Sequence, residues 1–440
     1  MDIIDHPAAQ PLLQDAQLSA SAVRSCADQL PAFIQRYLPC FYRDEQRHHA
    51  RTILEGKLSG LQRKTTEPIA IQARQKRRPL QLFVGDGGWD DDAVLAELHR
   101  HVAAELGDPE GVFILDPSAF PKKGEQSCGV ARQWCGCLGK VENCQRGVFV
   151  AYAAKRGCTL VDRRLYLPRE RADDEGHRAK THVPDAVTFL ETWRIGLELL
   201  DRVREVVPGS WVVGDDELGR CTELRGQLRL RRLHYVLDVP CNTLVRDPLE
   251  RQPPSRQGGK PRLLPFERVE QWAARQPAGR WRTVTVRDGE KGPIQVKVLL
   301  ATVQTKEADG RVGPLERLAV LRSCAKKPQT WYTLSNARQA QRWQIAAVHG
   351  ARHRVEELLG AGKQEVGLGH YEVRSWVGWH HHMTLSLLAL WFLQLEKLRL
   401  GKKNAGGDGG ASAGDLHGAI AGAERECGAD RGGGECGAAA

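Results

Sequence analysis

The sequence predicts a mixed α/β protein, and three patterns indicate this fold class. Apolar residues recur every three or four positions over residues 50–61, as they do on one face of a helix. Two short apolar runs of the strand type end in aspartate, at Asp116 and Asp215. Apolar and polar residues alternate over residues 283–304 around an Asp-Gly pair, which indicates a β-hairpin. We therefore expect helices, then a core with a sheet, then a β-rich segment.

Residues 1–108 are expected to form a helical N-terminal domain. Asp90 can cap a helix with regularly spaced apolar residues, and Gly107 can end it. A stretch rich in arginine and lysine, residues 63–78, lies between the predicted helices. Because clustered basic residues bind the backbone of nucleic acids, we interpret this part as a DNA-binding domain.

The segment 109–240 is expected to carry the strands of the core. Apolar runs there are short and are bounded by turn-forming residues, as in strands. A helix is predicted between the third and fourth of these runs, which places helices beside the sheet. The predicted strands cover residues 112–116, 147–153, 159–167, 211–215 and 233–239.

The remainder of the chain divides into three predicted parts. Residues 241–336 are expected to form a β-rich insertion, and helices are expected to resume over 337–402. Within these helices the apolar segment 383–395 is too short to span a bilayer, so it is predicted to be buried. The tail, 403–440, is rich in glycine and alanine and is expected to be disordered.

The net charge indicates the class of binding partner, and the cysteine pattern indicates the cellular compartment. The formal net charge of +10 favours a polyanionic partner, for which DNA or RNA is the usual candidate. Twelve cysteines occur without a CxxC pair, so free thiols in a reducing cytoplasm are favoured over a zinc site. We expect no signal peptide, because the N-terminus lacks a charged start followed by an apolar run.

The two strand-end aspartates are candidates for metal chemistry. Carboxylates on neighbouring strands can share Mg²⁺, which prefers oxygen ligands. A third carboxylate from a helix would complete a site for two ions. Aspartate is also common at strand ends for a simpler reason, because it favours turns and helix caps. Asp116 and Asp215 alone therefore leave both explanations open.

Three segments together resemble the motifs of one enzyme family. Residues 116–124 read Asp-Pro-Ser-Ala-Phe-Pro-Lys-Lys-Gly, and residues 214–220 read Gly-Asp-Asp-Glu-Leu-Gly-Arg. Residues 352–363 begin with arginine, carry glutamate four positions later and end with lysine. This set resembles bacterial insertion-sequence DDE transposases of the IS-four-like superfamily, in the subgroup with the Phe-Pro-Lys-Lys-Gly motif. The likeness covers residues 30–402, with the motifs in the family's order.

The resemblance implies an RNase H-like fold, with a mixed five-stranded sheet, flanking helices and a β-rich insertion before the glutamate. It implies Asp116, Asp215 and Glu356 as catalytic ligands of two Mg²⁺ or Mn²⁺ ions. Two positions depart from the family pattern: His349 stands at the position of a tyrosine, and Pro117 stands where an acidic residue is usual.

The resemblance also implies contacts with DNA phosphates. Arg352 and Lys363 carry over from the family motif, and Lys122, Lys123 and Arg132 are further candidates. The implied substrates are the transposon's terminal inverted repeats and target DNA, bound by a homodimer in a bacterial cytoplasm near the nucleoid. The histidines at 380–382 are expected at the surface, near DNA, rather than on a metal.

The implied activity is metal-dependent cleavage at transposon ends, followed by transfer of the freed 3′-hydroxyl into target DNA. Two alternatives stay open. A decayed transposase would bind DNA without catalysis, and its motivation is the abrupt change to Gly/Ala-rich sequence after residue 403. A metal-dependent nuclease would cleave DNA without strand transfer.

Overall fold

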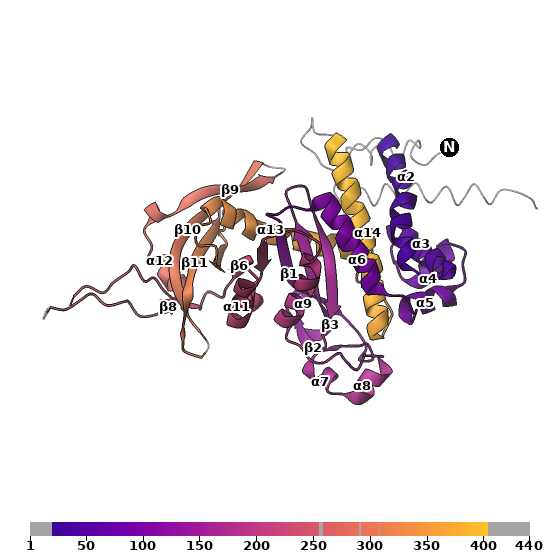
Figure 1. Cartoon of the computed structure of the whole chain (residues 1–440), viewed down its shortest axis with the longest axis horizontal. Coiled ribbons are helices and arrows are strands. Elements are labelled where there is room, and N and C mark those ends of the chain that lie inside the picture. The colour runs from indigo at the N-terminus through magenta and orange to yellow at the C-terminus, as the bar shows by residue number, and fades with distance from the viewer. Residues whose placement is uncertain (1–19, 255–257, 290–291, 308, 404–440) are drawn as a thin grey trace, which may run out of the picture.

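The computed structural model describes residues 20–254, 258–289, 292–307 and 309–403. The predicted disordered tail therefore lies outside the described residues. Figure 1 shows three regions side by side: helices near the N-terminus at one end, a sheet with helices in the middle, and long strands at the other end.

The central sheet has the order and directions of the predicted RNase H-like fold. The strand order is β4-β3-β1-β5-β6, with β1, β3 and β4 antiparallel and with β5 and β6 parallel to β1. All four residues of β5, Trp-Val-Val-Gly, are buried, as is usual for a parallel strand covered on both faces. The five strands are β1 (Val112–Pro121), β3 (Lys140–Ala153), β4 (Cys158–Leu165), β5 (Trp211–Gly214) and β6 (His234–Asp238).

The first strand is longer than the sequence predicted. We expected it to end at Asp116, but β1 continues to Pro121 because β3 pairs with all ten of its residues. The parallel neighbour β5 pairs only with residues 112–115. A short additional strand, β2 (Ala131–Cys135), pairs with the first part of β3.

The segment after β6 extends the same sheet. Strand β12 pairs antiparallel with β6, and β11, β10, β7 and β8 follow in that order. Strand β9 pairs with β10, so the predicted hairpin is confirmed. A short helix and a small apolar cluster around Trp272 lie within this region. The elements are β7 (Leu244–Arg246), β8 (Glu267–Arg268), α12 (Val269–Ala274), β9 (Arg282–Gly289), β10 (Gly292–Lys306), β11 (Val312–Ser323) and β12 (Thr330–Ser335).

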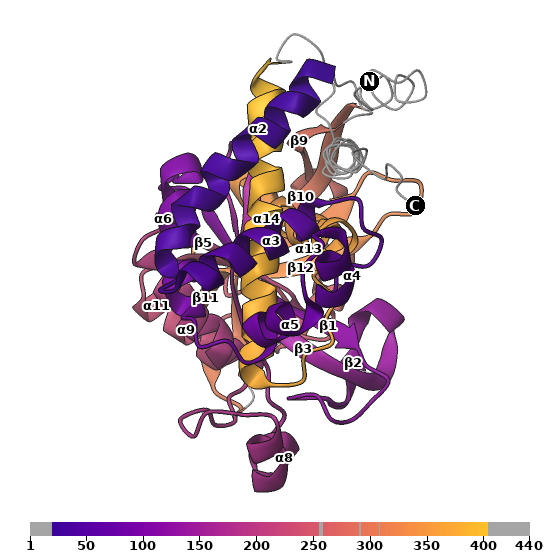
Figure 2. The same ribbon diagram turned by 90° about the vertical axis from the view of Figure 1, so that its right-hand side faces the viewer.

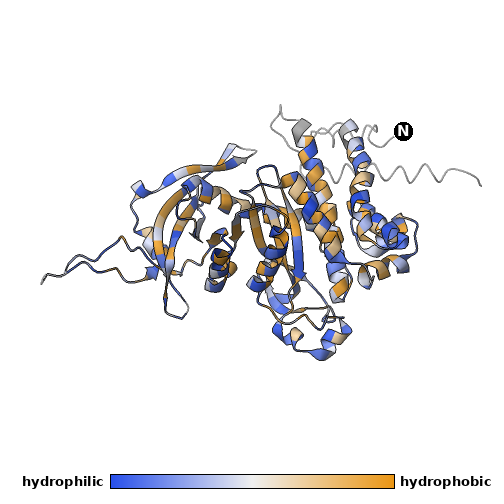
Figure 3. Cartoon of the chain, viewed as in Figure 1, coloured by the Kyte–Doolittle hydropathy of each residue, from blue (hydrophilic) through white to orange (hydrophobic). Residues whose placement is uncertain are grey.

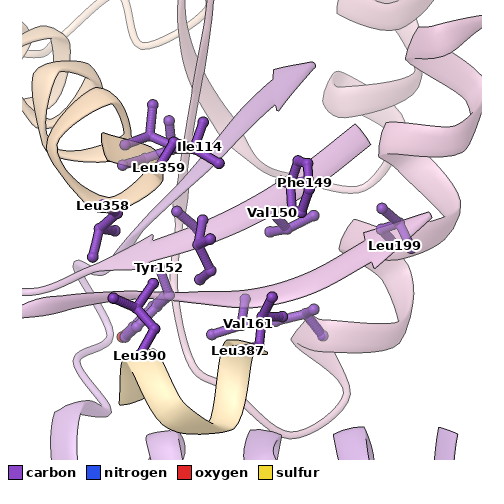
Figure 4. Close-up of a cluster of buried hydrophobic side chains, with 14 of the residues drawn as sticks. Ile114, Phe149, Val150, Tyr152, Val161, Leu199, Leu358, Leu359, Leu387 and Leu390 are labelled. Atoms are coloured by element: carbon purple, nitrogen blue, oxygen red, sulfur yellow. The ribbon is translucent and has the colours of Figure 1, made fainter. Parts of the chain in front are cut away.

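Helices α9 and α13 pack on the central sheet, and α14 packs on β4. Figure 4 shows Leu358 and Leu359 of α13 and Leu387 and Leu390 of α14 among side chains of β1, β3 and β4. Each fully buried leucine stabilises the fold by about 1.5–3 kcal/mol. The helices between β4 and β7 and after β12 are α7 (Arg169–Ala172), α8 (Glu175–Lys180), α9 (Thr192–Arg204), α10 (Asp216–Gly219), α11 (Thr222–Leu230), α13 (Arg342–Glu365) and α14 (Trp376–Lys403).

The N-terminal helices pack around α14 and share one apolar cluster with the sheet. Figure 2 shows α2 and α3 crossing in front of α14, and Figure 3 shows apolar residues along most of α14. The predicted domain boundaries stay a prediction. These helices are α2 (Ala20–Tyr37), α3 (Asp44–Leu58), α4 (Thr66–Gln72), α5 (Arg77–Gly85) and α6 (Asp91–Leu106).

The central position of α14 confirms one prediction and corrects another. Residues 383–393 are almost completely buried, as expected for the apolar segment. The histidines at 380–382 were expected at the surface, and this was wrong, because all three are buried. Each ring finds a backbone carbonyl: that of Trp376 at 2.8 Å, of Trp89 at 3.1 Å and of Gly367 at 3.1 Å. In the described part of the chain, no helix has the length and hydropathy needed to cross a membrane.

Candidate active site

The register of the parallel strands places Asp116 and Asp215 side by side. The last paired residues of β1 and β5 are Leu115 and Gly214, so the two aspartates are the next residues on neighbouring strands. Adjacent strands lie about 4.8 Å apart. Asp215 leaves the sheet and caps α10, where its Oδ1 accepts the backbone N–H of Leu218 at 3.1 Å. The sheet thereby holds two carboxylates at one edge.

The electrostatics of Asp116 connect it with the other predicted site residues. Burial, together with the negative charges of Asp215 and Glu356, raises the pKa of the Asp116 carboxyl from 3.8 to about 7, although Arg352 and Lys363 oppose the rise. Burial also raises the pKa of Asp215, and the hydrogen bond from Leu218 opposes this. The charges of four other predicted site residues therefore act on the carboxyl group of Asp116. The site thus holds two half-buried carboxylates side by side, and nearby positive charges compensate their negative charge only in part.

Helix α13 supplies the third carboxylate and two cations from one side. Arg352, Glu356 and Lys363 are four and seven residues apart, a spacing that keeps them on one face. The neighbouring face carries Val355 and Leu359, which are buried as α13 packs on β1 and β5. The Glu356 side chain is 60% exposed, and its Oε2 lies 3.9 Å from Nδ1 of His353.

Only two of the three predicted carboxylates lie next to each other. Among the described residues, no group of three or more His, Cys, Asp or Glu side chains is close enough to hold a metal ion. Asp116 and Asp215 lie on adjacent strands. Glu356 lies at the surface, and its negative charge raises the pKa of Asp116. The Asp116 carboxylate has no hydrogen bond or ion pair within the described part of the chain. Its oxygen atoms lie beside a second carboxylate and are the kind of ligand that a hard divalent cation prefers.

The predicted DNA-contacting residues fall into two groups. Lys363 donates from Nζ to Ser118 Oγ at 3.1 Å, and Lys122 Nζ lies 3.4 Å from the ring centroid of Tyr371. Burial lowers the pKa of Lys122 to about 8. Lys123 and Arg132, in contrast, are exposed. Contact of any of these cations with DNA stays a prediction.

The sequence interpretation missed Asp238. This residue ends β6, and its Oδ2 lies 3.1 Å from Nη1 of Arg352. Its Oδ1 lies 3.1 Å from Nε2 of His349. The available signal was an aspartate near the end of the predicted strand 233–239, the same pattern that drew attention to Asp116 and Asp215.

Two cavities lie away from the carboxylates. One, of about 430 Å³, lies at the opposite end of β1 and β5 and is lined by Val112, Trp211 and Trp343. The other, of about 450 Å³, lies beside Tyr371 and Arg374. Neither includes the three predicted ligands, so the candidate site is not part of either cavity.

Comparison with known proteins gives one family match. The family described as DDE superfamily endonuclease matches residues 36–293, which is more than half of the chain. The match includes Asp116 and Asp215 and ends before Glu356. Among solved structures, a piggyBac transposase in a synaptic complex with hairpin DNA is similar at 9% identity and a TM-score of 0.39. The similarity covers 89% of this chain and 73% of that one. No curated protein matches.

Proposed function

Because this chain belongs to the DDE superfamily endonucleases, we propose that it is a transposase that cleaves DNA at transposon ends and joins the freed 3′-hydroxyl to target DNA. The observation that carries this proposal is the register of β1 and β5, which sets Asp116 beside Asp215. A pair of half-buried carboxylates with raised pKa values is typical of a functional site.

Asp116, Asp215 and Glu356 are the proposed ligands of two Mg²⁺ or Mn²⁺ ions. When bound, such ions supply an activated nucleophile and neutralise charge on the leaving oxygen. The two aspartates are fixed by the sheet, whereas Glu356 lies on the surface of α13.

The cations around the carboxylates support DNA as the substrate. Arg352 and Lys363 lie close enough to Asp116 to lower its pKa, so a phosphate at the site would meet both charges. Lys123 and Arg132 are exposed and available to phosphates further along the DNA. We propose the terminal inverted repeats and target DNA as the substrates and a homodimer as the active species.

The test separates binding from cleavage. Asp116→Ala, Asp215→Ala and Glu356→Ala should each lower Mg²⁺-dependent cleavage of transposon-end DNA by at least about 100-fold, because the charge that stabilises the transition state is lost. DNA binding in a gel-shift assay should persist, since lysine and arginine supply the affinity.

Asp216→Ala and Glu357→Ala are matched controls, because both are exposed acidic neighbours with arginine partners. Their cleavage should stay close to that of the parent. Equal losses for the Asp215 and Asp216 variants would contradict the site assignment. A parent that binds but never cuts with Mg²⁺ or Mn²⁺ would indicate a decayed transposase. A parent that cuts but never joins a pre-cleaved 3′-hydroxyl end would indicate a nuclease.

A further inference from the structure

A third aspartate, Asp238, is buried and lies in line with the two proposed ligands. Strands β5 and β6 pair in parallel up to Gly214 and Leu237, so Asp215 and Asp238 follow at the same level. The same relation holds between Asp116 and Asp215. Three neighbouring parallel strands therefore present one aspartate each at one edge of the sheet.

The contacts of Asp238 differ from those of the other two. One carboxylate oxygen lies 3.1 Å from Nη1 of Arg352, and the other lies 3.1 Å from Nε2 of His349. The side chains of Asp238 and His349 are 9% and 6% exposed, so this contact is shielded from water. One oxygen accepts a hydrogen bond from Arg352, whereas the other lies near His349 without a hydrogen bond. A metal ion at Asp238 would have to displace the guanidinium of Arg352, which makes Asp238 a poor ligand.

The partner Arg352 connects Asp238 with the catalytic pair. Arg352 lies on α13, which packs on β1, β5 and β6, and its partner Asp238 is level with Asp215, so the guanidinium lies beside the edge that carries both catalytic aspartates. A guanidinium that is free to move forms a bidentate ion pair with a carboxylate, through two parallel hydrogen bonds. Such a pair at Asp116 or Asp215 would occupy the oxygens that a divalent ion needs. Asp238 offers the guanidinium an alternative partner to these two carboxylates. In the order of the strands, Asp215 lies between Asp238 and Asp116.

We propose that Asp238 is a positioning residue that restrains Arg352 beside the catalytic aspartates and keeps it from neutralising them. The inference rests on the proposed metal site at Asp116 and Asp215. In this arrangement the arginine remains available to a DNA phosphate while the two carboxylates remain available to divalent ions. Residues that orient the groups around a metal commonly affect metal affinity or activity by about 10–100-fold.

The experiment measures Mn²⁺ binding to the full chain by titration calorimetry, without DNA, beside Mg²⁺-dependent cleavage. Asp238→Asn keeps the size of the side chain and removes its charge. We expect Mn²⁺ affinity to fall by about 10-fold, because Arg352 is released toward the aspartates. Asp238→Glu, which keeps the charge, should retain more of the affinity than Asp238→Asn.

A double-variant cycle distinguishes positioning from a general structural effect. Arg352→Gln removes the competing cation, so adding Asp238→Asn to it should leave Mn²⁺ affinity unchanged. Glu316→Gln is a matched control, because Glu316 is a buried carboxylate paired with Arg225 at 3.2 Å, on strand β11. It should lower the melting temperature while Mn²⁺ affinity stays at the parent's value.

Two results would overturn the positioning role of Asp238. One is an equal loss of Mn²⁺ affinity for Asp238→Asn in the parent and in the Arg352→Gln background. The other is parental affinity for Asp238→Asn in a parent that binds Mn²⁺ and cleaves DNA. A parent that neither binds Mn²⁺ nor cleaves would instead contradict the proposed function.

Discussion

At the scale of single residues, the carboxyl of Asp116 is held under conditions that favour its protonated form. The cause is burial, with the charge of Asp215 adding to it, and the result is a pKa of about 7 against an ordinary value of 3.8. Between these two pH values the folded protein keeps a proton that the unfolded chain has lost. This group therefore favours folding below pH 4, and its contribution disappears as the pH rises through 7.

Asp116→Asn should consequently stabilise the metal-free protein at alkaline pH. At pH 8 the variant should exceed the parent by about 1–3 kcal/mol of unfolding free energy, and the difference should shrink toward pH 4. Mg²⁺ should raise the melting temperature of the parent and leave that of the variant unchanged. Thermal unfolding at several pH values, with and without Mg²⁺, checks this. A variant less stable than the parent at pH 8 would show that the carboxylate is compensated in the folded state.

At the scale of elements, a buried ion-pair network joins the strand extension to the central core. Glu316 of β11 is almost fully buried and contacts Arg225 at 3.2 Å and Arg229 at 3.5 Å, both on α11. It also accepts the hydroxyl of Tyr235 on β6. The network therefore supplements the short backbone pairing of β6 with β12, which involves two residue pairs.

Glu316→Ala should remove the nearer of the two carboxylates that pair with the buried guanidinium of Arg225, leaving Glu307 at 3.6 Å. We expect a loss of about 3–5 kcal/mol of stability, because an uncompensated buried charge is costly. Glu316→Gln should lose less, since an amide oxygen can still accept the hydrogen bonds of Arg229 and Tyr235. Urea unfolding of the two variants and the parent measures both effects. A change below about 1 kcal/mol for Glu316→Ala would mean that water or rearrangement replaces the pair.

At the scale of the whole molecule, the positive balance of the chain should govern its affinity for DNA. The formal net charge is +10, and Lys123 and Arg132 are exposed near the end of β1 and on β2. Affinity for non-specific duplex DNA should fall by about 1000-fold or more between about 50 and 200 mM salt, because several phosphate contacts release counterions. Equilibrium binding over a salt series tests this. Binding that is independent of salt would contradict phosphate recognition.

The sequence by itself determined the order of the elements and the two aspartates at the sheet. Both rest on local information: apolar runs of strand length predict β1, β5 and β6, and an Asp-Gly pair predicts the hairpin of β9 and β10. The family motifs selected Asp116, Asp215 and Glu356 from many acidic residues. None of these steps required knowledge of which segments meet in space.

Only the tertiary structure decided which residues surround the two aspartates. Strand β1 continues past Asp116 because β3, more than twenty residues later in the chain, pairs with it. The histidines at 380–382 are buried because α14 lies between the N-terminal helices and β4, and no pattern within α14 reveals that cover. Asp238 meets Arg352 for a similar reason: 114 residues separate them, and the packing of α13 on β6 closes that distance. Contacts of this kind depend on long-range packing, which local periodicity does not encode.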